Sequence, residues 1–221
     1  MKRPIVHALV LALACVSAAP AAEVLRAPPA KPDPARRYLF YLHGAIVEQG
    51  GEKPVHPRWG LYDYPAALEA LGARGAIVIS ERRGETEPVE YAGKVAEQVR
   101  SLLRAGVPAG RIGIVGFSKG GAIAIHASHL LARADVAFVL LGACGEWLAD
   151  EPGLRLHGRV LSIRETSDTV GGSCRSLADR RGGSGAFEEI AISTGKEHGA
   201  FYLPGAVWVE PTLDHLAQEN R

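Results

Sequence analysis

The segment Gly116-Phe117-Ser118-Lys119-Gly120 sets a serine between two glycines, where a strand-like run gives way to a helix-like run. The apolar residues 112–115 precede it, and residues 119–132 continue with helical spacing. So sharp a turn needs glycine two positions before and two after the serine, because side chains there would collide. The following helix directs its free N–H groups and its positive end toward the serine. The pattern therefore predicts a nucleophile held on a sharp turn between a strand and a helix.

Two other interpretations of this segment are a glycine turn without chemistry and a phosphate-binding loop. A phosphate-binding loop needs Gly, four residues and then Gly-Lys-Ser/Thr, and the residues around Lys119 do not have that order. The strand-like run before the serine, the helix-like run after it and the further Gly121 favour the nucleophile.

Short apolar runs alternate with helical patterns along most of the 221 residues. The apolar runs are 38–42, 76–80, 111–115, 136–141, 159–163 and 188–192, and the helical patterns are 65–74, 88–105, 119–132 and 212–219. This alternation predicts a mainly parallel sheet with helices on both faces. A hydrophobic content of 47% suits one globular domain with a real core, which we expect over residues 38–221.

The first 21 residues have the layout of a secretory signal. Lys2 and Arg3 form a basic start, residues 5–16 are almost wholly apolar, and small residues precede an expected cleavage before Ala22. A membrane anchor or a buried helix is the alternative, but this run is short for a span. Lipidation of Cys15 is a second, minor alternative. The pattern predicts export to the periplasm or the medium.

The proline-rich residues 22–37 are expected to be an extended, mobile leader. After the N-terminus, no segment has the roughly 20 apolar residues of a membrane span. The formal net charge of +1 supplies no electrostatic basis for binding nucleic acid.

On three anchors the chain resembles the α/β-hydrolase family. They are Leu42-His43-Gly44 after the first apolar run, the serine turn that ends in Gly120-Gly121, and His198-Gly199 near the end. The resemblance extends from Tyr38 to the end of the chain. It implies the α/β-hydrolase fold, with a mainly parallel sheet flanked by helices on both faces. It also implies that the reaction needs neither a metal nor an organic cofactor.

The family's chain order of nucleophile, acid and histidine assigns the other two catalytic residues. Among the eight histidines only His198 follows the last expected strand, whereas His126 and His129 are expected to pack or to face solvent. Two carboxylates, Glu165 and Asp168, follow the run 159–163. Resemblance to the family's G-x-x-D pattern favours Asp168, although Thr166 replaces the glycine. Glu165 remains the alternative acid.

The resemblance also implies an oxyanion hole made by the backbone N–H groups of Lys119 and Ala45. The Lys119 side chain is expected to be exposed. His43, Gly44 and Trp59 are the expected substrate-binding residues.

Three further expectations concern the surroundings of the site. Cys144 and Cys174 follow neighbouring strands at the same edge of the sheet, so a disulfide between them would hold the loop of Asp168. Arg82 and Arg83 are expected at the surface, where they could attract an acidic substrate. The stretch 142–158 leaves no room for a large lid domain.

These expectations lead to a serine hydrolase that cleaves an ester-type bond of a small molecule. Thioesters, peptides and lactones are cleaved by the same machinery. The alternative is a catalytically silent domain of the same fold that binds a ligand or a partner, because a fold alone does not prove a function.

Overall fold

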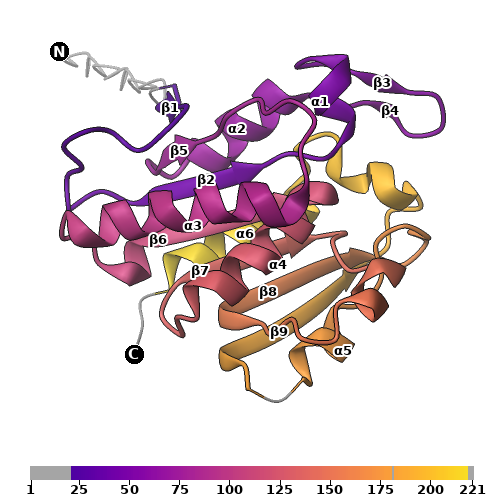
Figure 1. Cartoon of the computed structure of the whole chain (residues 1–221). Helices are drawn as coiled ribbons and strands as arrows, with labels where there is room; N and C mark the ends of the chain where they lie inside the picture. Colours follow the sequence, from indigo (N-terminus) through magenta and orange to yellow (C-terminus); the bar gives the residue numbers. More distant parts are fainter. Residues whose placement is uncertain (1–20, 181, 219–221) are drawn as a thin grey trace, which may run out of the picture.

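The fold is built around a seven-stranded sheet in which every pair of neighbouring strands is parallel (Figure 1). A computed structural model describes residues 21–180 and 182–218. In spatial order the strands are β1 (Val24–Leu25), β5 (Ile77–Ile79), β2 (Tyr38–Leu42), β6 (Ile112–Phe117), β7 (Ala137–Leu141), β8 (His157–Glu165) and β9 (Ser184–Ile192). The expected parallel sheet is therefore confirmed.

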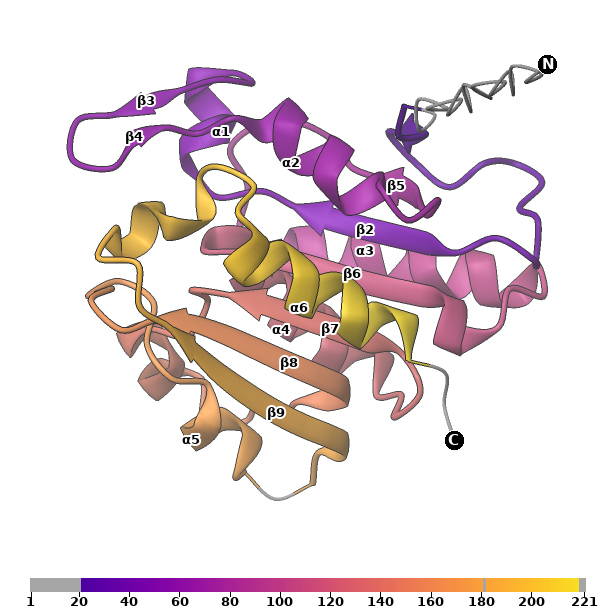
Figure 2. The same cartoon turned by 180° about the vertical axis from the view of Figure 1, so that it is seen from behind.

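Helices lie on both faces of this sheet, as predicted. The helices are α1 (Ile46–Gly50), α2 (Tyr64–Gly72), α3 (Pro88–Arg104), α4 (Lys119–Leu131), α5 (Arg175–Ala178) and α6 (Ala206–Ala217). Helices α3 and α4 cover the face turned toward the viewer in Figure 1, and α6 crosses the opposite face, seen in Figure 2. A separate hairpin of β3 (Val55–His56) and β4 (Gly60–Leu61) follows α1.

The sheet separates two hydrophobic clusters, because successive side chains of a strand point to opposite faces. In β7, Phe138 and Leu140 belong to the cluster under α3 and α4, whereas Val139 and Leu141 belong to the cluster under α2 and α6. The central strands are buried throughout, which explains their continuous apolar sequences.

The structure differs from the sequence-based expectations at both ends of the domain, and it adds α1, the β3–β4 hairpin and α5, which the sequence patterns did not predict. The leader was expected to be mobile, but its residues Val24 and Leu25 form β1, which pairs with β5 at the edge of the sheet. Backbone hydrogen bonds within an edge pair can order such a segment despite its prolines. Helix α6 starts well before residue 212 because Pro211 lies within the helix instead of preceding it.

All seven strands of this sheet run in one direction, so their carboxyl ends lie at one edge of the sheet, and the loops after β2, β6, β7, β8 and β9 gather there. The connection from β7 to β8 contains one 3₁₀ turn, Glu146–Asp150, and no α-helix. Within the described ranges, no helix has the length and apolar character needed to cross a bilayer. The expected signal, residues 1–21, lies outside the described residues except for Ala21.

Candidate active site

Ser118 occupies a strained backbone position between β6 and α4. Its φ and ψ are 54° and −120°, outside the regions that side chains ordinarily favour. Its N–H donates to the carbonyl of Leu141 at 3.0 Å, and its carbonyl accepts from Ala122 within α4. Neighbouring backbone therefore holds the serine on the sharp turn that the sequence predicts.

The glycines around Ser118 are required by close packing of the backbone. A Cβ atom on Gly116 would lie 2.3 Å from the carbonyl oxygen of Gly120, and one on Gly120 would lie 1.9 Å from that of Leu42. A Cβ on Gly121 would lie 2.3 Å from the Cβ of Ala143. Any side chain at these positions would push α4 away from the strand ends, so the glycines set where the serine stands.

His198 and Asp168 complete a continuous chain of hydrogen bonds with Ser118. The Nε2 atom of His198 lies 2.8 Å from the Ser118 Oγ, and its Nδ1 lies 2.7 Å from the Asp168 Oδ2. Because a carboxylate only accepts, Nδ1 carries the proton and Nε2 is free to accept from the serine hydroxyl. Asp168 lies in the loop after β8, and His198 lies in a 3₁₀ turn, Glu197–Phe201, after β9.

The Asp168 carboxylate stays ionised although it is buried. Its Oδ1 accepts from the N–H groups of Val170 at 2.8 Å and Gly171 at 3.2 Å. Burial alone would raise the pKa of Asp168, but the hydrogen bonds from His198 and from these amides outweigh burial and lower it. The group can therefore hold one imidazole tautomer and stabilise a cationic imidazole.

Gly142 is a residue of this site that the sequence-based reasoning missed. Its φ is +50°, and a Cβ atom there would lie 3.2 Å from the Asp168 Oδ2 and 3.4 Å from the His198 Cε1. The absence of a side chain leaves room for the histidine–carboxylate pair. The position directly after β7, the strand beside the serine strand, is the signal that could have identified it.

Glu165, the alternative acid, faces a different set of partners. Its carboxylate is 1% exposed and accepts from the N–H groups of Ser167, Thr194 and Gly195 and from the Ser167 hydroxyl. These bonds tie the end of β8 to the turn after β9. Glu165 thus joins the loop of Asp168 to the segment that leads to His198, and it makes no hydrogen bond with His198 among the described contacts.

The loop after β2 lies beside the serine. A Cβ atom on Gly44 would lie 3.6 Å from the Ser118 Cβ. Ala45 is the N-cap of α1 and Lys119 is the first residue of α4, so both N–H groups belong to helix starts, where a helix leaves its donors unpaired. The roles of Ala45 and Lys119 as oxyanion donors, and of Gly44 in substrate binding, stay predictions.

The expected role of His43 in substrate binding is wrong, because its ring is sealed within the protein. His43 is 0% exposed. Its Nε2 accepts from the Arg83 N–H at 3.0 Å, and its Nδ1 donates to the Gly44 carbonyl at 2.9 Å. Burial, and then the charge of Arg83, lower the pKa of His43 to about 3, so the neutral ring supports the Gly44 loop from below.

The expected surface position of Arg83 is wrong, and the Lys119 side chain is only partly exposed, at 21%, because both side chains bind one buried carboxylate. Glu48 Oε2 accepts from Lys119 Nζ at 2.8 Å, and Glu48 Oε1 accepts from Arg83 Nε at 3.0 Å. The Glu48 and Arg83 side chains are 4% and 2% exposed. A further N–H of Arg83 donates to the His43 carbonyl. Arg83 and Lys119 thus bind the same carboxylate, that of Glu48 on α1. The sequence analysis did not predict this contact because it did not predict α1.

Trp59, the third expected substrate-binding residue, lies against the histidine. Its ring centroid is 5.2 Å from that of His198, and its Nε1 donates to Glu197 at 3.0 Å. A Cβ atom on Gly199 would lie 2.7 Å from the Trp59 Cβ. The β3–β4 hairpin thus contributes one wall beside the imidazole. Substrate contact by Trp59 stays a prediction.

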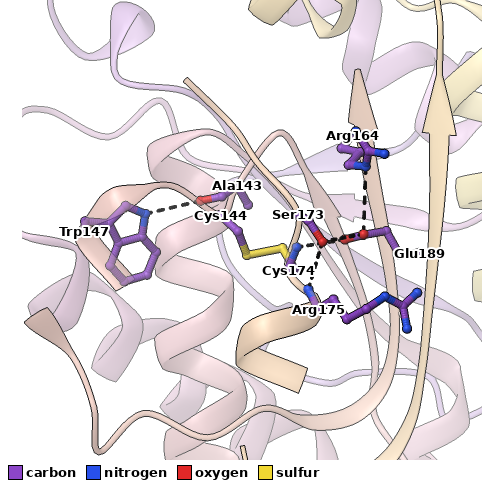
Figure 3. Close-up of a disulfide and its surroundings, with 8 residues drawn as sticks. All are labelled: Ala143, Cys144, Trp147, Arg164, Ser173, Cys174, Arg175 and Glu189. Atoms are coloured by element: carbon purple, nitrogen blue, oxygen red, sulfur yellow. Dashed lines mark hydrogen bonds and ion pairs between the residues drawn. A yellow bond between two sulfur atoms is a disulfide. The ribbon is translucent and has the colours of Figure 1, made fainter. Parts of the chain in front are cut away.

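The expected disulfide between Cys144 and Cys174 is present and braces the Asp168 loop (Figure 3). It joins the connection after β7 to the end of the loop after β8. Figure 3 shows Glu189 of β9 accepting from Ser173 and from the Cys174 N–H, at 2.6 and 2.8 Å. The Gly172 N–H also donates to the Cys144 carbonyl. Asp168 is therefore held by Glu165 at one end of its loop and by the disulfide at the other.

Within residues 21–180 and 182–218, no group of three or more His, Cys, Asp or Glu residues is arranged to hold a metal ion.

Comparison with known proteins identifies relatives only at the level of structure. No protein-family model matches the chain, and no curated protein matches it. The solved structure of SOBER1 from Arabidopsis thaliana superposes with a TM-score of 0.56 at 12% identity, covering 82% of this chain and 98% of SOBER1. A variant of SOBER1 gives a TM-score of 0.53 at 11% identity, covering 81% and 97%. At such identities the likeness shows a shared fold.

Proposed function

We propose that this chain, which has the α/β-hydrolase fold, is a serine hydrolase that cleaves an ester-type acyl bond. The observation that carries this proposal is the unbroken hydrogen-bond chain from Ser118 through His198 to Asp168. A serine hydroxyl is a weak nucleophile at neutral pH and needs a neighbouring base, which His198 supplies.

In the proposed reaction the Ser118 Oγ attacks the carbonyl carbon of the substrate while His198 Nε2 takes the hydroxyl proton. The carbonyl oxygen becomes an oxyanion, which accepts from the N–H groups of Ala45 and Lys119. Each such donor stabilises the transition state by about 3–4 kcal/mol. The intermediate then expels the alcohol, which takes the proton from His198. A water molecule repeats the sequence on the acyl-enzyme and releases the carboxylic acid.

The residues outside the triad support the same mechanism. Gly44 lies beside Ser118, and the next N–H along the chain, that of Ala45, is the proposed second oxyanion donor. Asp168 keeps its charge, which stabilises the imidazolium formed in the first step. The open connection after β7 leaves Ser118 in contact with a cleft. These features favour a small-molecule ester as substrate.

Labelling with a fluorophosphonate probe tests the proposal. The wild-type protein should become labelled and should hydrolyse p-nitrophenyl acetate, and Ser118→Ala should lose both properties. Ser176→Ala, at an exposed serine of α5, is the matched control and should keep both. Labelling that survives Ser118→Ala would assign the nucleophile elsewhere. A wild-type protein that neither labels nor hydrolyses esters would instead support the silent ligand-binding alternative.

We also propose that the protein is exported and that its mature chain begins at Ala22. The disulfide supports this, because such bonds persist in oxidising compartments. The Ala22 nitrogen lies 3.1 Å from Glu69 Oε2 of α2, so the ammonium group created by cleavage there would meet a carboxylate. Intact-mass measurement of the secreted protein should give a start at Ala22. A mass carrying lipid on Cys15 would establish the anchor instead.

A further inference from the structure

A cleft of about 360 Å³ opens beside Ser118 and continues along α4. Ser118, Ala122 and His126, which are four residues apart in turn, all line it and so share one face of the helix. The opposite walls come from the start of α3 and from the connections after β7 and β8. They include Val89, Trp147 and Val170.

The middle of this cleft is apolar and partly open. Val89 and Val170 are 54% and 48% exposed. Both border the cleft, together with the Trp147 ring and the Ala122 side chain. Apolar side chains left accessible around a cleft that contains a nucleophile fit an apolar arm of a substrate.

His126 lies at the end of the apolar stretch, and its ring makes no hydrogen bond with the residues that the structure describes. His126 is only 7% exposed. The other buried histidines are all bonded: His43 and His198 through both ring nitrogens, and His215 to the Arg159 carbonyl. The fully buried side-chain atoms without a partner among the described residues belong to Arg83, Arg159 and Thr212, so the His126 nitrogens remain accessible to a ligand or to water. The His126 ring instead lies 5.8 Å from the Trp147 ring, centroid to centroid, and lines the cleft.

The charges around the cleft decide which group at the end of a substrate's apolar arm can bind beside His126. Burial lowers the pKa of His126 below its ordinary value, so the ring is neutral and offers one donor and one acceptor. Glu87 and Glu151 also line the cleft. The one lysine there, Lys119, is already paired with Glu48. The cleft therefore repels a terminal carboxylate and suits an uncharged group that donates and accepts.

The spacing on α4 sets the length of the arm. From Lys119 to His126 the helix rises about 10 Å, at 1.5 Å per residue. An acetyl group bound to Ser118 would not reach the imidazole, whereas an acyl chain of medium length would.

We propose that His126 is a substrate-recognition residue, and that the substrates are esters with a medium-length apolar acyl chain ending in a hydroxyl or similar uncharged polar group. This inference rests on the proposed hydrolase function, because it names the substrates of that enzyme. The second experiment below measures binding alone and does not require turnover.

The first experiment compares kcat/KM for p-nitrophenyl esters of hexanoate, 6-hydroxyhexanoate and adipate, which differ only at the chain end. The wild-type enzyme should prefer 6-hydroxyhexanoate to hexanoate by about tenfold, the worth of one hydrogen bond to a buried group, and should disfavour adipate. His126→Leu should remove the preference for the hydroxyl, and His126→Gln should retain part of it. His129→Leu changes an exposed histidine of the same helix and should leave the preference intact.

The second experiment measures binding without turnover. The Ser118→Ala variant is titrated with methyl 6-hydroxyhexanoate and methyl hexanoate while tryptophan fluorescence is followed, and a parallel titration with Trp147→Phe added identifies the cleft as the source of the signal. Tighter binding of the hydroxy ester, lost on adding His126→Leu, would support the inference even if no ester is hydrolysed. Equal binding of the two esters, or a preference that survives His126→Leu, would overturn it. Acetate hydrolysis that depends on Ser118 would then still uphold the hydrolase.

Discussion

The Nε2 atom of His198 lies 2.8 Å from the Ser118 Oγ, although 80 residues separate the two in sequence. His126 and His129 are much nearer along the chain, but α4 carries them away from the serine. The partnership forms because β6 and β9 end at the same edge of a parallel sheet. The acid, the cleft, the buried contacts of Glu48 and Glu165, and the disulfide all lie at that edge. Their roles can be tested separately.

Asp168→Asn should lower kcat for p-nitrophenyl acetate by about 10³–10⁴-fold, because an amide cannot hold the required tautomer or stabilise the imidazolium. Glu165→Gln should lower it far less, since Glu165 bonds to Ser167, Thr194 and Gly195. Its main effect should be a loss of about 2 kcal/mol in the free energy of unfolding. Steady-state kinetics and urea unfolding of both variants make the comparison. The reverse ranking in kcat would assign the acid to Glu165.

Glu48→Gln should reduce both stability and kcat, because it leaves Arg83 and Lys119 without their shared counter-charge next to the predicted oxyanion donors. Removing one partner of a buried ion pair typically costs about 3–5 kcal/mol of unfolding free energy. We expect kcat to fall by about tenfold with little change in KM, since a displaced donor weakens mainly the transition state.

The matched control for Glu48 is Glu97→Gln on α3, whose carboxylate pairs with Arg104 and whose side chain is 60% exposed. An exposed pair contributes at most about 1 kcal/mol, so this variant should match the wild type in kcat. A Glu48→Gln enzyme with unchanged kcat at a temperature where it is fully folded would show that the network serves stability alone.

His43 should make the protein less stable as the pH falls below about 6.5. The folded-state pKa is lowered to about 3, so between these values the unfolded chain takes up a proton on His43 that the folded protein excludes. The contribution is complete above pH 6.5, and its loss approaches about 1.4 kcal/mol per pH unit below that value.

Denaturant unfolding at pH 7 and pH 5 would measure this effect in the wild type and in His43→Gln. The variant cannot titrate at that position, so its stability should fall less between the two pH values, even if it starts lower. Equal pH dependence in the two proteins would mean that the buried His43 does not resist protonation.

Loss of the Cys144–Cys174 disulfide should lower the free energy of unfolding by about 3–4 kcal/mol, because the bond closes a loop across a separation of 30 residues. It should also reduce turnover, since the bond braces the loop of Asp168. Adding a reductant to the wild type should reproduce the effect of the double variant C144A/C174A. The double variant itself should not respond to reductant, and a response would point to another target.

Local features of this fold and site could be predicted from the sequence because they depend on short-range sterics. Gly116 and Gly120 around Ser118 indicate a turn that no other residues could form, and the apolar runs indicate strands buried on both faces. The α/β-hydrolase resemblance then indicated the order of acid and base along the chain. Cys144 and Cys174 were identified as a disulfide pair from their positions after predicted strands. Trp59 was identified as a candidate for the site wall from its place in the loop that follows the first predicted strand.

Other features depended on contacts between distant segments, which the sequence pattern does not encode. His43 looked like a substrate contact, but Arg83, 40 residues away, occupies its Nε2. Lys119 looked exposed, but Glu48, 71 residues away, binds its amine. Each of these side chains could face either the interior or the solvent, and that choice is made by the partners that the folded sheet brings beside it.

The sequence by itself therefore determined the main strands of the sheet, the helices α2, α3 and α4, and the nucleophile turn, because backbone sterics and side-chain periodicity act within a few residues. Tertiary structure alone decided the other features. Glu48 binds two cations, Glu165 joins two loops, and Gly142 leaves space for the histidine–carboxylate pair. The ring of His126 has no hydrogen-bond partner among the described residues. Burial makes an unpaired polar group costly. Only the complete arrangement of partners shows which polar groups are paired among the described residues and which, like the His126 ring, line a cleft without a partner.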